Sequence, residues 1–122
     1  MTYQISWLVP ERVIELVVPE VFSGGVERAV DADMNALLAT TTNTVHILCD
    51  LRGIKQFPSA TESMNTTYYR RANMGTFLTI GMTSNPVMRF LSSLVARGFG
   101  VRFKDFNSRE EALAYLASVE HL

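Results

Sequence analysis

Hydrophobic positions near the start of the chain alternate with polar ones and then form a short continuous run. Tyr3, Ile5 and Trp7 lie on one face of an extended segment, which predicts a strand over residues 3–8. The apolar run 13–18 predicts a second strand. Only residues 9–12 separate the two, and Pro10 suits a turn because its ring presets φ. We therefore expect an antiparallel hairpin.

Helical and extended patterns alternate along the rest of the chain. Val26, Val30, Met34, Leu37 and Leu38 recur at helical spacing, which predicts an amphipathic helix that follows Ser23-Gly24-Gly25 and ends at Asn43. Short apolar runs then predict strands over residues 45–49, 76–82 and 101–106. Capping side chains predict helices that begin at Pro58-Ser59, at Ser84-Asn85-Pro86 and at Ser108, the last with Leu113, Leu116 and Ala117 facing inward.

The resulting order is β-β-α-β-α-β-α-β-α within a single domain of 122 residues. Strands that alternate with helices favour parallel pairing through right-handed crossovers. The sequence thus predicts an α/β fold with a mostly parallel five-stranded sheet, in which the first strand is the antiparallel exception.

Composition narrows the class of protein. Apolar residues make up 48% and charged residues 19% of the chain, which is typical of a globular domain. No stretch approaches the ~20 apolar residues that a membrane-spanning helix needs, and residues 1–8 do not resemble a signal peptide. The single cysteine, Cys49, suits a reducing compartment. We expect a cytoplasmic protein that does not span a membrane.

Charge is small overall but unevenly distributed. The net charge is −1, which gives no support to nucleic-acid binding. Residues 63–104 nevertheless contain six basic side chains and no acidic one. They form either a basic face for an anionic partner or separate surface charges that point in different directions.

Candidate ligand-binding side chains follow the predicted strands, where parallel α/β sheets bind ligands. Asp50 ends the central strand, and Ser59, Ser84 and Asn85 begin helices whose free amides attract anions. The alternative is that the latter three only cap helices and that Asp50 only accepts hydrogen bonds within its turn. Capping alone accounts for these side chains.

The sequence contains no clear arrangement of catalytic side chains. Cys49 and His46 are three positions apart on one strand and therefore point to opposite faces. We expect a small buried thiol and a hydrogen-bonded core histidine, with no metal site, no cofactor and no enzymatic activity. Asp31 and Asp33 are expected to lie on a solvated helix face.

Tyr68, Tyr69, Arg70 and Arg71 form an unusual cluster with two interpretations. Aromatic side chains beside arginines are typical of an interface. Alternatively, Tyr68 packs inward while Tyr69 and the arginines cover the surface with their stems.

Three stretches of the chain resemble the SpoIIAA-like family of STAS-type domains, the fold of anti-sigma factor antagonists: 9–14 (VPERVI), 47–54 (ILCDLRGI), and 84–102 with Glu110-Glu111-Ala112-Leu113. The resemblance implies successive β-α turns wound as a superhelix, a fold shared with CRAL-TRIO lipid-binding domains. It also implies a bacterial signalling role. In that family a kinase phosphorylates a serine in an Asp-Ser-Ser-Gly loop. Here Pro58 replaces the aspartate and Ala60 the serine, which leaves Ser59 and Thr61 as neighbouring hydroxyls.

These observations lead to three hypotheses. The first is a protein-interaction module that binds a partner through the segment from Ser59 to Arg71. The second is a carrier or sensor of a small acidic or lipid-like ligand, bound in an apolar pocket under the helix predicted to begin at Pro58-Ser59, with Arg70, Arg71 or Arg89 at the mouth of the pocket. An enzyme ranks last. We also expect a homodimer, because the chain is apolar and sheets of this kind expose their edges.

Overall fold

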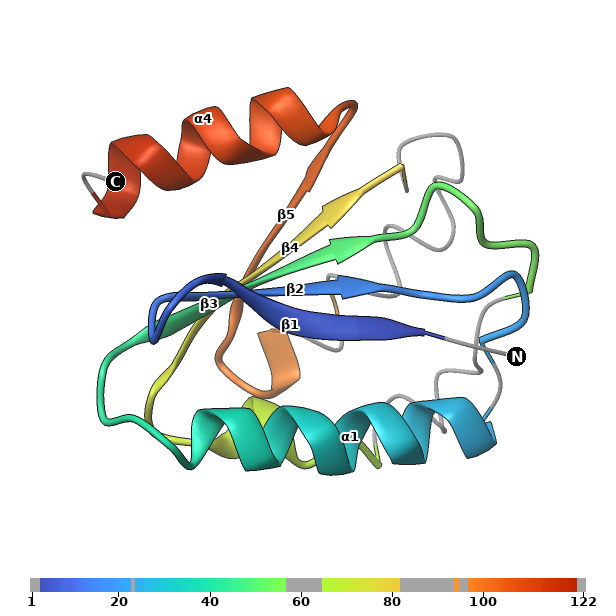
Figure 1. Cartoon of the computed structure of the whole chain (residues 1–122), viewed down its shortest axis with the longest axis horizontal. Coiled ribbons are helices and arrows are strands. Elements are labelled where there is room, and N and C mark those ends of the chain that lie inside the picture. The colour runs from blue at the N-terminus through green and yellow to red at the C-terminus, as the bar shows by residue number, and fades with distance from the viewer. Residues whose placement is uncertain (1–2, 23, 57–64, 82–93, 95–96, 121–122) are drawn as a thin grey trace.

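A computed structural model describes residues 3–22, 24–56, 65–81, 94 and 97–120. Five strands, two α-helices and one 3-10 turn are defined in these residues: β1 (Gln4–Val9), β2 (Val13–Val17), α1 (Gly24–Leu38), β3 (Val45–Asp50), η1 (Tyr68–Arg70), β4 (Met74–Ile80), β5 (Arg102–Phe106) and α4 (Arg109–Glu120). The chain is a mixed α/β protein in which α1 and α4 lie on opposite faces of the sheet (Figure 1).

The sheet places its strands in the order in which they occur in the sequence, β1-β2-β3-β4-β5. β1 and β2 pair antiparallel, whereas β2–β3, β3–β4 and β4–β5 pair parallel. The sheet is therefore mixed, and its edges are β1 and β5. β3 lies at the centre with five of its six residues buried, as its continuous apolar run predicted.

The β1–β2 turn carries a backbone strain that the sequence did not indicate. The amide of Arg12 donates to the carbonyl of Val9 over 3.0 Å, which closes the predicted turn behind Pro10. Glu11 has φ +61°, the only positive φ among the described residues other than glycine. This left-handed conformation costs a residue with a Cβ atom about 1–2 kcal/mol of free energy.

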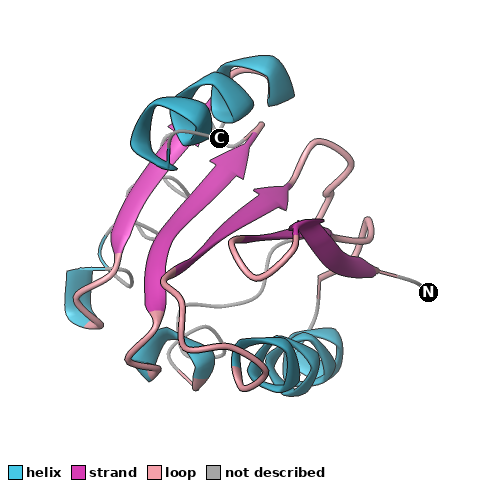
Figure 2. Ribbon diagram, turned by 60° about the vertical axis from the view of Figure 1, so that its left-hand side comes forward, coloured by secondary structure: helices cyan, strands magenta, loops and turns pink. Residues whose placement is uncertain are grey.

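One half of the core lies between the sheet and α1. Val26, Val30, Met34 and Leu38 are almost completely buried, so the predicted stripe is the one that α1 turns inward. They pack against the side chains that β2 and β3 present to this face, among them Ile14, Leu16, Ile47 and Cys49. Figure 2 shows η1 on the same side of the sheet as α1.

The other half of the core lies beneath α4. Ala112 and Leu116 of this helix pack against Leu48, Leu78 and Ile80. Of the three residues predicted to face inward, Leu116 is buried, whereas Leu113 and Ala117 are half-buried. Ala112, which was not predicted, is the other fully buried residue of this stripe. The hydroxyl of Ser108 accepts a hydrogen bond from the Glu111 amide over 3.2 Å, which confirms the predicted N-cap.

Helix α1 ends earlier than the pattern predicted. It stops at Leu38, not at Asn43. The following threonines are poor helix formers, and the Thr40 hydroxyl donates to the Leu37 carbonyl over 2.6 Å within the last turn. The helices predicted to begin at Pro58-Ser59 and at Ser84-Asn85 have their starts outside the described residues. Gly100, with φ +71°, lies in the turn after the helical residues 97 and 98, as its role in helix termination predicted.

Candidate functional site

Asp50 lies at the carboxyl end of β3 and is engaged by its own turn. Its carboxylate accepts hydrogen bonds from the Arg52 amide and Nε, both over 3.0 Å, and from Arg52 Nη2 over 2.8 Å. These hydrogen bonds hold the pKa of Asp50 below its usual value. The hydrogen bonding predicted for Asp50 within its own turn is thus confirmed, and both of its carboxylate oxygens also accept from the Arg52 side chain.

A second ion pair lies on the same face of the sheet. Arg109, at the start of α4, donates from Nε to Glu15 of β2 over 2.9 Å. The pair joins α4 to β2, which lies three positions in the sheet from β5, the strand that precedes α4 in the chain. Arg109 also contributes to lowering the pKa of Asp50, so the two pairs are electrostatically linked.

Tyr68 and Tyr69 both pack against the core. Tyr68 is buried, and burial raises the pKa of its phenol well above its usual value. Tyr69 is half-buried, with its ring centroid 5.5 Å from Phe77 and 5.4 Å from Phe99. Arg70 is exposed and lies over the Phe99 ring at 5.1 Å. The inward packing of Tyr68 is confirmed, whereas Tyr69 is part of an aromatic cluster and not only a surface cover.

One acidic side chain of α1 holds this segment in place. The carboxylate of Asp31 accepts from the amides of Thr67 and Tyr68, over 2.8 and 3.0 Å, and from the Thr67 hydroxyl over 2.7 Å. The expectation of a solvated face was wrong for Asp31, because a loop distant in sequence brings three donors to it. Asp33 also accepts a hydrogen bond, from Tyr3, but it is exposed, as expected.

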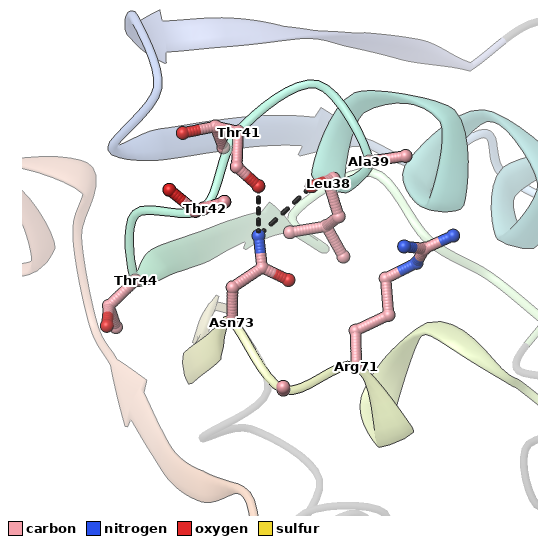
Figure 3. A pocket seen from close by; sticks show the side chains of 8 residues that line it. Leu38, Ala39, Thr41, Thr42, Thr44, Arg71 and Asn73 are labelled. Atoms are coloured by element: carbon pink, nitrogen blue, oxygen red, sulfur yellow. Dashed lines mark hydrogen bonds between the residues drawn. The ribbon is translucent and has the colours of Figure 1, made fainter.

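Arg71 lies at a surface pocket of about 480 Å³ between the end of α1 and the starts of β3 and β4 (Figure 3). Its Nε donates to the Asn35 amide oxygen over 2.7 Å. On the other side, the Asn73 amide donates to the carbonyls of Leu38 and Thr41, over 3.0 and 3.1 Å. The remaining lining residues are Ala39, Thr42, Thr44 and Ala72.

The pocket lies at one end of the strands, whereas the candidate ligand-binding side chains were predicted at the other end, where the strands finish. Thr44 and Asn73 immediately precede β3 and β4, so the pocket is at the amino ends of these strands. Arg71 is the one predicted residue that lines it. Asn73 and the threonines were not predicted as site residues. A polar run directly before each of two adjacent strands was the only signal for them in the sequence.

Cys49 and His46 are structural, as predicted. Cys49 is buried among the side chains beneath α1, and burial raises the pKa of its thiol, which keeps it protonated and unreactive. His46 is buried, and its Nδ1 lies 2.7 Å from the Thr76 hydroxyl. In the described part of the chain, no three His, Cys, Asp or Glu side chains gather where they could hold a metal ion.

The described basic residues of the acid-free stretch do not share one face. Arg70 stacks on Phe99, and Arg71 lies beside the end of α1. Lys104 instead lies 4.7 Å from the ring centroid of Tyr115 in α4, which is on the opposite side of the sheet. Of the two interpretations, scattered surface charges fit these three side chains.

Five predicted site residues lie outside the described part of the chain: Ser59, Thr61, Ser84, Asn85 and Arg89. Among the residues that the structure describes, no helix has the length and apolar character needed to cross a membrane. Comparison with protein-family models, curated proteins and solved structures found no match to this chain.

Proposed function

We propose that this chain is a non-enzymatic regulatory or protein-interaction module with a STAS-type fold, acting in bacterial signalling, and that the segment from Ser59 to Arg71 binds its partner. The observation that carries the proposal is the attachment of the described part of this segment, residues 65–71, to α1. Three hydrogen bonds to Asp31 fix the backbone of residues 67 and 68, directly before two exposed arginines. A surface ordered before binding loses less conformational entropy when a partner binds.

The state of the reactive side chains supports a role without catalysis. The Asp50 carboxylate accepts hydrogen bonds from Arg52. Burial raises the pKa of the Cys49 thiol and of the Tyr68 phenol, so both stay protonated. An activated nucleophile needs a lowered pKa or an adjacent base. These groups stabilise the fold instead.

The strand order also supports the STAS assignment. A hairpin followed by strands that each pair parallel with the previous one is what successive β-α turns produce. The resemblance in residues 47–54 falls on β3 and the Asp50 turn, the element that precedes the regulatory loop in that family.

Affinity capture with matched variants tests the interaction role. The wild-type protein is compared with Arg70→Glu, which reverses an exposed charge beside the proposed surface, and with Arg102→Glu, which makes the same change on the exposed β5 edge. We expect a bound protein that Arg70→Glu loses and Arg102→Glu retains. Equal capture by all three proteins would contradict the proposal.

A phosphorylation switch is tested separately at Ser59 and Thr61. Incubation with a bacterial kinase extract and phosphopeptide mapping is expected to label one of these hydroxyls, although Ala60 occupies the family's phosphorylated position. The Ser59→Ala/Thr61→Ala double variant is the control. Labelling that persists in this variant, or no labelling of the wild type, would argue against a switch here.

A carrier or sensor of a small acidic or lipid-like ligand is the second candidate function. The observation that favours it is the pocket lined by Arg71, one of the three arginines predicted to lie at a pocket mouth. Native mass spectrometry of the purified protein separates the two candidates. A co-purified small molecule favours the carrier, whereas the bare chain mass favours the interaction module.

A further inference from the structure

We propose that the pocket between the end of α1 and the starts of β3 and β4 binds a small zwitterion of the α-amino acid class. This inference rests on the second candidate function and is tested separately from the partner-binding role, with which it shares Arg71. The volume of the pocket, about 480 Å³, is within the ~300–1,000 Å³ range of small-molecule sites.

Arg71 supplies the group that recognises a carboxylate. Asn35 accepts from Arg71 Nε over 2.7 Å, while the Asn35 amide donates to the Asp31 carbonyl and to the Thr67 hydroxyl, over 2.9 and 2.8 Å. This chain of hydrogen bonds orients the guanidinium and leaves its terminal nitrogens for another acceptor. Among the described residues, no carboxylate forms an ion pair with Arg71. A guanidinium held in this way favours a planar carboxylate, which it binds through two parallel hydrogen bonds.

The side of the pocket that Asn73 forms is suited to a cation. The pocket borders the C-terminal end of α1, where the helix dipole places partial negative charge. The Asn73 nitrogen donates to two carbonyls there, so the Asn73 oxygen is turned toward the side on which Arg71 stands (Figure 3). That oxygen can accept a hydrogen bond from an ammonium group.

Arg71 and Asn73 together favour a ligand that carries both charges. A plain anion such as phosphate would pair with Arg71 but could not donate to the Asn73 oxygen. A ligand with a carboxylate and an ammonium group satisfies both side chains. Between them, the exposed methyl groups of Ala39 and Ala72 contact an aliphatic side chain, and the hydroxyls of Thr42 and Thr44 line the rim.

Titration of the ¹⁵N-labelled protein with L-leucine tests the proposal, with amide chemical shifts as the measurement. We expect saturable shifts confined to residues 38–44 and 71–75. Leucinamide, which lacks the carboxylate, and 4-methylpentanoate, which lacks the ammonium group, are expected to bind about tenfold more weakly or worse. Equal binding of 4-methylpentanoate would show a site for anions only and would overturn the zwitterion.

Arg71→Gln and Arg102→Gln are the matched variants. Both remove one exposed positive charge, but Arg102 lies on β5 and does not line the pocket. Arg71→Gln is expected to weaken L-leucine binding by about tenfold or more, and Arg102→Gln to leave it unchanged. No shifts with L-leucine, or the same loss in both variants, would contradict the proposal. Because capture of a partner is measured separately, failure here leaves the interaction role intact.

Discussion

At the scale of single residues, two carboxylates hold segments of backbone in place. Asp31 of α1 accepts three hydrogen bonds from residues 67 and 68, which lie 36 and 37 positions further along the chain. Asp50 accepts a hydrogen bond from the Arg52 amide within its own turn, two residues away.

Glu11 gives a prediction about backbone strain. Its φ of +61° is tolerated by asparagine better than by other side chains. We expect Glu11→Asn to raise the free energy of unfolding by about 0.5–1 kcal/mol, measured by urea denaturation. Glu11→Ala is the control, since it removes the charge but keeps the strained Cβ. Equal stability of both variants would mean that the turn carries no such strain.

Asp50 gives a prediction about pH. Hydrogen bonding to Arg52 lowers its pKa in the folded protein, so its contribution to stability is present above the unfolded pKa of about 3.9 and is lost as pH falls through the folded value. We expect Asp50→Asn to be less stable than the wild type at pH 7 and to lose less stability on acidification. The measurement is urea unfolding from neutral pH to about pH 2. Parallel curves for the two proteins would contradict this assignment.

At the scale of elements, the end of α1 is decided by a side chain from another part of the fold. The last carbonyls of a helix have no partner within the helix. The Asn73 amide donates to the carbonyl of Leu38, the last residue of α1, and to that of Thr41 in the following loop. The hydrophobic stripe located the body of this helix correctly. Its end depends both on the threonines that follow it and on Asn73, which precedes β4, and only the threonines are visible in the local sequence.

Asn73→Ala tests this cap. Loss of the two hydrogen bonds to the Leu38 and Thr41 carbonyls is expected to lower the free energy of unfolding by about 1–2 kcal/mol, measured by chemical denaturation. Asn43→Ala is the matched control, because Asn43 lies in the same loop and contributes its backbone amide, not its side chain, to the hydrogen bond with Thr41. An equal effect of the two substitutions would rule out a specific capping role.

At the scale of the whole molecule, the sheet leaves two edges. β1 pairs only with β2, and its exposed residues Gln4 and Ser6 carry no charge that would hinder pairing with another strand. We retain the prediction of a homodimer and place its contact at β1, where two copies can extend the sheet across a twofold axis.

Sedimentation equilibrium tests this contact. The wild type is expected to sediment as a dimer, and Ser6→Lys as a monomer, because antiparallel pairing would bring the two introduced lysines near each other. Arg102→Glu at the β5 edge is expected to leave the dimer intact. A wild-type monomer at every concentration would exclude dimerisation, and a dimer unaffected by Ser6→Lys would place the contact elsewhere.

The sequence alone determined the features that depend on local periodicity. These are the hairpin around Pro10, the buried faces of β3 and α1, the Ser108 cap and the structural roles of Cys49 and His46. Only the tertiary structure decided which distant groups meet: Asp31 with the η1 segment, Arg109 with Glu15, and Arg71 with the end of α1 across a pocket. Hydrophobic spacing specifies which face of an element is buried. It carries no information about which loops the crossovers bring together, and in this protein the candidate ligand site lies between such loops.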